Sequence, residues 1–445
     1  MTEISSFGLC LFRVSLRNDK NLTKLLPREN IINRIHESIY KQNLIFVLGN
    51  EGVGKSWVAA RNWLTMMKKP LHLFLSAQKL GDLDINDLES FLIKKIIEQT
   101  NETSNDLSIK KWKDRFEKCG NLSDQGNIDL LITIDGINQK PNINWSEVIN
   151  NLTYFFKNKN VKILVTSRTI FFNEIVKRKI SDEYEVVTVS DWTAEERDEI
   201  LIEKKINPKS LSASVAQSLL NPRLLNIALS LFDTKEIQTI DELDVNRILL
   251  EHIRRMESDN YENITYTDFL KNLQTHAKEI IDRLEDEDDD LNYFNGQLDA
   301  VAEGHFFEVI ADDLNAYKLK DEGLSFALGL EIVLQLNKMK RNGKNLDDGL
   351  AKVIDPINAL DKTSDIIISS LTILIFESNY YSKEVLTALV KCFVSLQNTD
   401  DSYLNYFTTI VEKKISDFIN ILEELCLDGG HQPNFDWTKN SIIYV

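Results

Sequence analysis

The stretch that decides the fold is Gly49-Asn50-Glu51-Gly52-Val53-Gly54-Lys55-Ser56, which follows the apolar run Leu44-Ile45-Phe46-Val47-Leu48. It fits the pattern G-x-x-x-x-G-K-[ST], in which glycines let the backbone turn its N–H groups toward phosphate oxygens. A helix starting near Trp57 would add its positive N-terminal end at the same place. The order strand, loop, helix predicts a phosphate-binding loop; the alternative is a glycine-rich turn with a surface lysine.

Two side chains of this loop have specific expected roles. Lys55 would reach the β- and γ-phosphates of a nucleoside triphosphate, and the Ser56 hydroxyl would ligate Mg²⁺. The remaining loop residues would surround the phosphates with backbone groups. The predicted nucleotide-binding residues of this segment are Gly49, Asn50, Glu51, Gly52, Val53, Gly54, Lys55, Ser56 and Trp57.

The first half of the chain alternates apolar runs with helical segments, which is typical of a parallel sheet covered on both faces. We therefore predict an α/β doubly wound parallel-sheet domain with five strands joined by crossovers. The expected strands span 44–48, 71–75, 128–135, 161–168 and 185–189, and the expected helices span 57–67, 86–99, 108–118 and 145–157.

Two charged residues close predicted strands of this sheet. Asp135 ends one of them, and ligands of open parallel sheets bind beyond the carboxyl ends of the strands. We interpret Asp135 as the Walker B carboxylate on the Mg²⁺ side, with a plain turn residue before Gly136 as the alternative. Arg168 follows another strand, where its guanidinium could hydrogen-bond a γ-phosphate and report its presence. A solvated arginine is the alternative there.

Beyond Val189 the strand signal fades and helical patterns dominate. Thr193 and Glu196 have the spacing of a capping box, which predicts a helix start. Further helices are expected at 212–220 and 222–232. A mixed segment comes next at about 240–336, and 347–425 is predicted to be helical with short polar breaks.

Composition narrows the function classes. With 445 residues, 43% of them hydrophobic, the chain can form two to four domains with cores of their own. No apolar stretch approaches the roughly 20 residues of a membrane span, and residues 1–14 lack the pattern of a secretory signal. We therefore expect a cytoplasmic protein with no membrane partner.

Cysteine usage and net charge argue against disulfide-linked, zinc-binding and duplex-binding proteins. The four cysteines are far apart and form no C-x-x-C pair or His/Cys cluster, so disulfides and structural zinc are not expected. The net charge of −17 argues against a broad duplex-binding surface, because nonspecific nucleic-acid affinity comes mostly from Lys and Arg. Nucleic acid is therefore not an expected partner.

The motifs, taken together, resemble the STAND class of P-loop NTPases, the signalling switches that include NACHT and NB-ARC proteins. The resemblance is carried by four stretches: residues 49–56, Asp135-Gly136, Thr166-Ser167-Arg168 and Leu220-Asn221-Pro222-Arg223-Leu224-Leu225. In that family the proline of the last motif lies near the adenine, which implies this role for Pro222. Upstream, Pro27-Arg28-Glu29-Asn30 occupies the place of the lead-in to the nucleotide base.

The resemblance implies an ASCE-type P-loop core that uses ATP and Mg²⁺. It assigns catalysis to Lys55, Asp135 and Arg168, the metal to Ser56 and Asp135, and part of the nucleotide contact to Pro222. The implied domains are an N-terminal lead-in arm at 1–40, the P-loop NTPase core at 41–190, a helical subdomain at 191–238, a winged-helix-like domain at 239–340 and an α-helical region at 341–445.

Two departures from the family bear on turnover. Many members carry a further acid just after the Walker B aspartate, whereas Gly136-Ile137-Asn138-Gln139 supplies none, so we expect slow hydrolysis. Asn138 lies in the neighbourhood where related enzymes often carry that acid. The family's Met-His-Asp triplet is also missing, and we interpret His305 as an ordinary, partly buried histidine.

The leading hypothesis is an ATP-binding STAND-type switch, a slow ATPase whose nucleotide controls conformation or self-association. The resemblance suggests ATP and ADP as ligands, a protein partner or effector, and signalling in antiphage defence of a prokaryote as the setting. One alternative is an AAA+-like ATPase or DNA-replication initiator, which also joins a P-loop core to a winged helix. A further alternative is a scaffold that binds ATP without hydrolysing it.

Overall fold

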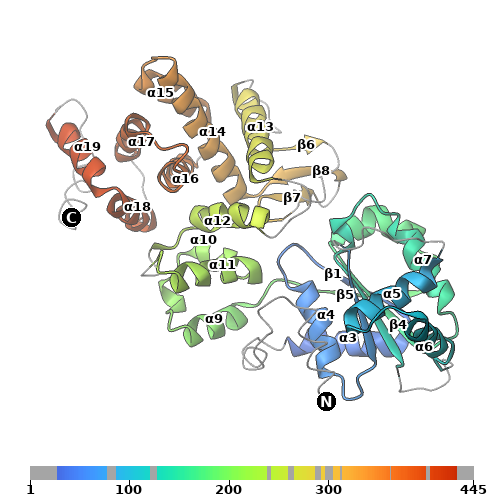
Figure 1. Cartoon of the computed structure of the whole chain (residues 1–445). Helices are drawn as coiled ribbons and strands as arrows, with labels where there is room; N and C mark the ends of the chain where they lie inside the picture. Colours follow the sequence, from blue (N-terminus) through green and yellow to red (C-terminus); the bar gives the residue numbers. More distant parts are fainter. Residues whose placement is uncertain are drawn as a thin grey trace. The chain divides into compact units, whose positions relative to one another are not determined.

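The chain forms two compact units in the computed structural model, residues 1–192 and 193–445 (Figure 1). The structure describes residues 28–77, 87–120, 128–237, 242–258, 265–285, 292–295, 304–310, 313–360, 362–396 and 401–427.

The first unit is built on a five-stranded sheet whose strand pairs are all parallel. Its order is β2-β3-β4-β1-β5, so β4 lies between β1 and β3. The five predicted strands are confirmed, with shifts of one or two residues at their ends. Their bounds are β1 (Leu44–Leu48), β2 (Leu71–Ser76), β3 (Leu130–Asp135), β4 (Val161–Ser167) and β5 (Tyr184–Thr188).

Every residue of β1 and β4 is buried, which indicates that both faces of this sheet are covered. Helices α3 and α4 pack against β1, and α5 packs against β2. This arrangement fits a P-loop NTPase α/β fold. The helices are α3 (Glu29–Lys41), α4 (Lys55–Thr65), α5 (Leu88–Thr100), α6 (Asp106–Glu117), α7 (Trp145–Phe155) and the short α8 (Thr169–Phe171), with single turns at Ile137–Gln139, Phe172–Val176 and Lys177–Lys179.

A buried histidine, His72, lies on β2, an edge strand of the sheet in the first unit. The His72 ring on β2 lies 2.9 Å from Thr133 Oγ1 on β3 and stacks on Trp63 with ring centroids 5.2 Å apart. Only 1% of the residue is exposed, and this burial lowers the pKa of His72 to about 3. The native unit therefore holds a neutral imidazole at pH values where the unfolded chain, with a pKa of 6.5, takes up a proton.

We expect acid to destabilise the first unit through His72. Below the unfolded pKa of 6.5 the unfolded chain binds the extra proton, so stability is lost as the pH falls toward about 3. Between pH 6.5 and 5 the loss should be roughly 1.7 kcal/mol, because the full 1.36 kcal/mol per pH unit applies only once the unfolded histidine is mostly protonated. Urea unfolding at both pH values measures it, and His72→Gln should flatten the dependence. If His72→Gln lost as much stability between the two pH values as the unmodified protein, His72 would not be the cause of the acid sensitivity.

In its described residues, the second unit is helical apart from single turns and one small sheet. That sheet is antiparallel in the order β6-β8-β7, with β6 (Phe294–Asn295), β7 (Phe307–Ile310) and β8 (Asp313–Leu319). Among the described residues, no helix has both the length and the apolar run that a membrane crossing requires. The helices are α9 (Ala194–Glu203), α10 (Ala213–Ser218), α11 (Pro222–Asp233), α12 (Val245–Ser258), α13 (Tyr266–Glu285), α14 (Asp321–Arg341), α15 (Leu346–Ile357), α16 (Thr363–Phe376), α17 (Lys383–Ser395), α18 (Asp401–Lys413) and α19 (Ile415–Leu427).

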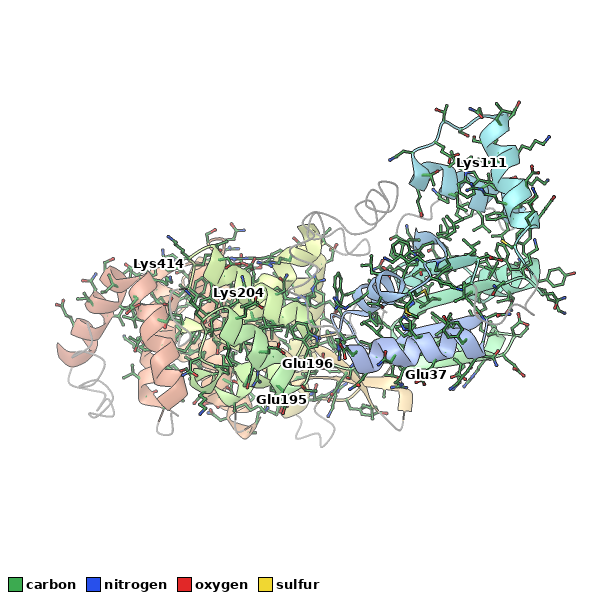
Figure 2. All side chains as sticks on the ribbon, turned by 90° about the horizontal axis from the view of Figure 1, so that it is seen from below. Glu37, Lys111, Glu195, Glu196, Lys204 and Lys414 are labelled. Atoms are coloured by element: carbon green, nitrogen blue, oxygen red, sulfur yellow. The ribbon has the colours of Figure 1, made fainter. Side chains whose placement is uncertain are left out.

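The predicted start of α9 is confirmed in detail. Thr193 Oγ1 accepts the N–H of Glu196 at 3.2 Å, and Glu196 Oε2 accepts the N–H of Thr193 at 2.9 Å. Both contacts belong to the capping box. Figure 2 shows Glu195 and Glu196 in the first turn of this helix, with Lys204 just beyond its last turn.

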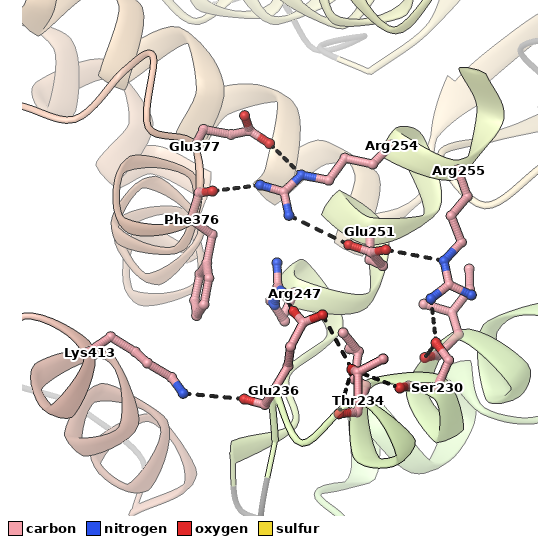
Figure 3. Close-up of polar contacts among 12 residues, drawn as sticks. Ser230, Thr234, Glu236, Arg247, Glu251, Arg254, Arg255, Phe376, Glu377 and Lys413 are labelled. Carbon is pink, nitrogen blue, oxygen red and sulfur yellow. Dashed lines mark hydrogen bonds and ion pairs between the residues drawn. The ribbon is translucent and has the colours of Figure 1, made fainter. Parts of the chain in front are cut away.

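Helix α12 joins the helices before it to the C-terminal helices of the same unit (Figure 3). Arg254 Nε donates to Glu377 Oε1 at 2.8 Å in the segment after α16. Arg247 Nη2 donates to Glu236 Oε2 at 2.6 Å just after α11, and the Glu236 carbonyl accepts from Lys413 Nζ at 3.2 Å on α18. Charged contacts thus connect α11, α12, α16 and α18.

Candidate nucleotide-binding site

The glycines of the loop at 49–56 have physical reasons to be glycine. Gly52 and Gly54 have φ angles of 75° and 91°, a left-handed region that L side chains rarely adopt. At Gly49 a Cβ would lie 2.3 Å from the carbonyl oxygen of Val189, because Val189 follows β5 and its N–H donates to Leu48 O at 2.7 Å. The loop is therefore shaped by its own backbone and by the neighbouring strand.

Helix α4 starts directly after the loop, at Lys55. Its N-cap residue is Gly54, which has no side chain to cap the first turn, so the first N–H groups face the loop. Lys55 Nζ donates to the carbonyl oxygens of Gly49 at 2.9 Å and Asn50 at 2.6 Å. A cation and a helix N-terminus thus lie at one loop, which suits an anionic ligand.

Asp135 lies at the end of β3 within a set of hydroxyl contacts. The Thr166 hydroxyl donates to Asp135 Oδ1 at 2.6 Å and accepts the N–H of Gly136 at 2.8 Å. The Ser56 hydroxyl also hydrogen-bonds the Asp135 carboxyl, and Lys55 attracts it electrostatically. Burial raises the pKa of Asp135, against the lowering effects of Thr166, Ser56 and Lys55 in that order. A hydroxyl and a carboxylate together are oxygen ligands that suit Mg²⁺.

Strand register explains why these groups meet. In the sheet Leu48 pairs with Ser167, and Ile134 pairs with Val165, so the carboxyl ends of β1, β3 and β4 coincide. Because β4 is the middle strand of the three, Thr166 can reach Asp135 on β3. Thr166 belongs to a motif that the sequence singles out, but the sequence assigns it no role.

Arg168 follows β4 and is almost fully buried. Its Nη2 lies 3.5 Å from Glu51 Oε2, and each of the two side chains is only 3% exposed. Glu51 belongs to the loop itself, so the predicted sensor arginine and the predicted phosphate loop are joined by an ion pair. The sequence places both residues near the nucleotide without indicating that they pair.

Asn138 holds the backbone of Arg168 in place. Its Oδ1 accepts the N–H of Arg168 at 3.2 Å, and the residue is 4% exposed. An acid at this position would lose that contact or bury a charge, which is unfavourable without a partner. The structure therefore gives Asn138 a contact with the backbone of Arg168 that the sequence does not predict.

Arg28, at the start of α3, connects the lead-in segment to the loop. Its guanidinium donates to the carbonyl oxygens of Val53 at 3.2 Å and of Asp191 at 3.1 Å. The residue has a left-handed φ of 45°, a strained conformation for a non-glycine residue. Pro27 of the same motif lies outside the described residues.

The two other predicted nucleotide-binding residues each lie at the start of a helix. Trp57 lies half-buried in the first turn of α4. Pro222 belongs to the second unit, where it is the first residue of α11. Asn221 caps that helix by accepting the N–H groups of Arg223 at 3.0 Å and Leu224 at 3.4 Å. The role of Pro222 beside the adenine stays a prediction.

Thr166→Val should weaken the predicted Mg²⁺ binding by Ser56 and Asp135 more than it destabilises the fold. It keeps the shape but removes the donor to Asp135 and the acceptor for Gly136 N–H. Loss of a partner that orients a metal ligand typically lowers metal affinity or activity by roughly 10–100-fold. Mg²⁺ titration of ATP hydrolysis measures the effect.

Thr133→Val is the matched control for that substitution. It removes another buried strand hydroxyl, the partner of His72 on β3, away from the loop. We expect it to lower stability while leaving the Mg²⁺ dependence intact. Equal shifts in Mg²⁺ dependence for both variants would mean that Thr166 acts only through stability.

Comparison with known proteins adds only distant similarities. No protein-family model matches the sequence, and no curated protein matches it. Among solved structures, the Walker-type ATPase of Pyrococcus abyssi is similar with a TM-score of 0.43 and 12% identity, over 72% of this chain and 99% of that chain. The ORC1 protein of Aeropyrum pernix in complex with DNA has a TM-score of 0.33 and 14% identity, over 61% of this chain and 75% of that chain.

RuvB of Thermotoga maritima is similar with a TM-score of 0.32 and 11% identity, over 66% of this chain and 92% of that chain. Similarities this distant leave the function to be argued from the site itself. The expectation that nucleic acid is not a partner stays a prediction.

Proposed function

We propose that this chain binds ATP with Mg²⁺ at the loop 49–56 and acts as a slow, nucleotide-controlled switch of the STAND type. The observation that carries this proposal is the meeting of Lys55, Ser56 and Asp135, a cation, a hydroxyl and a carboxylate, at one edge of the sheet. In this assignment Lys55 holds the β- and γ-phosphates, Ser56 and Asp135 hold Mg²⁺, and Arg168 senses the γ-phosphate.

The turn after β3 supports slow turnover. Fast hydrolysis needs a base or a positioned acceptor for the attacking water. This turn offers Gly136, with a φ of 74°, and Asn138, whose side-chain oxygen is occupied by the N–H of Arg168. Glu51, the carboxylate within the loop, is paired with Arg168. Of these three described residues, Gly136 and Asn138 carry no carboxylate and Glu51 has its carboxylate held by Arg168.

The second unit contains helices that we propose respond to the bound nucleotide. Its first helices correspond to the proposed helical subdomain, and α12, α13 and the sheet β6-β8-β7 to the proposed winged-helix-like domain. The contacts of α12 with Glu236 and Glu377 offer a path along which a signal from the C-terminal helices would travel. We propose antiphage signalling as the setting. The activating cue and the effector would each come from a protein partner or from a second copy of this chain.

Light scattering of the whole chain in ADP, in ATP and in a non-hydrolysable ATP analogue tests the switch. We expect a larger assembly, or a clear change in hydrodynamic radius, with the analogue and ATP but not with ADP. An identical mass and radius in all three conditions would contradict nucleotide-controlled association or conformational change.

An AAA+-like ATPase or replication initiator is a second candidate. The position of β4 between β1 and β3 supports an ASCE-type core, which both candidates share. The antiparallel sheet after two helices is compatible with a DNA-binding winged helix. Turnover of several per second without a partner, together with salt-sensitive duplex binding, would favour this candidate. Tight ATP binding with no turnover would instead favour the non-hydrolysing scaffold.

A further inference from the structure

Glu51 is an unexpected residue for a loop that binds phosphates. It is 4% exposed, lies between Gly49 and Gly54, and its charge has the same sign as the proposed ligand. A buried carboxylate is retained only when a partner compensates for its lost hydration. In the first unit that compensation includes Arg168, whose Nη2 lies 3.5 Å from Glu51 Oε2.

The ion pair joins two parts of the site that have different proposed ligands. Glu51 belongs to the loop that would hold every phosphate, whereas Arg168 would meet only the γ-phosphate. Asn138 accepts the backbone N–H of Arg168, and the Arg168 guanidinium lies within 3.5 Å of Glu51 Oε2, so the arginine is held beside the loop. A planar guanidinium that faces a carboxylate can exchange it for a phosphate, because both anions accept the same pair of N–H donors.

On the basis of the proposed nucleotide site, we propose that Glu51 is a specificity-determining residue that competes with the γ-phosphate for the Arg168 guanidinium. ATP displaces the carboxylate from Arg168, whereas ADP leaves the ion pair in place. The pair thereby lowers the affinity for ATP relative to ADP and gives the site two states, one with Arg168 on Glu51 and one with Arg168 on the nucleotide.

The charge of Glu51 is therefore expected to oppose ATP more than ADP. Glu51→Gln keeps the size of the side chain and one acceptor oxygen but removes the charge. Arg168 is then held less strongly and becomes available to the γ-phosphate. The ratio of the ADP Kd to the ATP Kd should rise by roughly tenfold, the scale of one charge-assisted hydrogen bond.

A double-mutant cycle on the full chain tests the competition. The Kd values for ATP and ADP are measured with Mg²⁺ for the unmodified protein, Glu51→Gln, Arg168→Ala and the double variant. We expect Glu51→Gln to raise the Kd ratio, Arg168→Ala to lower it, and Glu51→Gln to have no effect on the ratio when Arg168 is absent. An equal rise in both backgrounds, or no rise at all, would overturn the inference.

Glu51→Asp provides a second variant in case the uncharged one folds poorly. It keeps the negative charge but shortens the side chain by one methylene, so the contact with Arg168 lengthens. We expect a Kd ratio between those of the unmodified protein and Glu51→Gln, and an unchanged ratio would count against the competition. Failure of the unmodified protein to bind either nucleotide would instead reject the proposed function, and the inference with it.

Discussion

Lys55→Ala is expected to remove measurable ATP binding. Lys55 is the first residue of α4, directly after the glycines of the loop, and its ammonium donates to Gly49 O and Asn50 O. Charge-assisted hydrogen bonds contribute roughly 1.5–3 kcal/mol each, so the loss of contacts to two phosphates should weaken binding by at least about a hundredfold. Fluorescence anisotropy with a labelled ATP analogue measures the change.

Lys41→Ala is the matched control for the loss of a positive charge. Lys41 is an exposed lysine of the same unit at the end of α3, outside the loop. Its replacement should leave the ATP affinity within about twofold, because exposed charges are screened by solvent and salt. If Lys55→Ala bound the analogue as tightly as Lys41→Ala, the loop could not be the phosphate site.

Asp135→Asn should separate binding from hydrolysis. The amide oxygen can still accept from the Thr166 hydroxyl, so the local shape and much of the nucleotide affinity should survive. The negative charge next to Ser56 and Lys55 is lost, and with it the proposed Mg²⁺ ligand. We expect ATP hydrolysis to fall by roughly 10²-fold, the scale of a missing electrostatic group in an active site. Phosphate release at several Mg²⁺ concentrations measures it.

Asp129→Asn is the control at the opposite end of the same strand. Asp129 precedes β3, and its Oδ2 accepts the N–H of Gly120 at 2.7 Å. We expect this variant to hydrolyse ATP at the wild-type rate. Unaltered turnover and Mg²⁺ dependence in Asp135→Asn as well would mean that Asp135 only starts a turn.

The sequence predicts the sheet of the first unit well, because its signals are local. The apolar runs at 44–48 and 161–168 belong to strands that are buried on both faces, and such strands are nearly continuous in hydrophobicity. The loop pattern lies between a strand and a helix as expected. The capping box at Thr193 is likewise a local signal and is confirmed.

The partners within the site depend on strand order, which hydrophobic patterns do not encode. Only the placement of β4 between β1 and β3 brings Thr166 to Asp135. The same placement brings Arg168 to Glu51, although the two residues are far apart along the chain. The sequence motifs therefore include these residues but do not predict which of them contact each other. They also do not predict that Asn138 accepts the backbone N–H of Arg168.

Two other predictions are not tested by the structure of either unit taken alone. The role of Pro222 depends on how α11 meets a bound nucleotide, and Asn221 already explains locally why a helix starts there. The five-domain division is finer than the two compact units. Both stay predictions that rest on the resemblance of the motifs.

Calorimetric titration of ATP into the unmodified full chain, with and without Mg²⁺, tests whether the chain has a nucleotide site. If Lys55, Ser56 and Asp135 form a nucleotide site, ATP should bind saturably, with one nucleotide per chain, and more weakly when Mg²⁺ is removed. The absence of saturable binding by ATP or any other nucleoside triphosphate at millimolar concentration would show that Lys55, Ser56 and Asp135 form no nucleotide site.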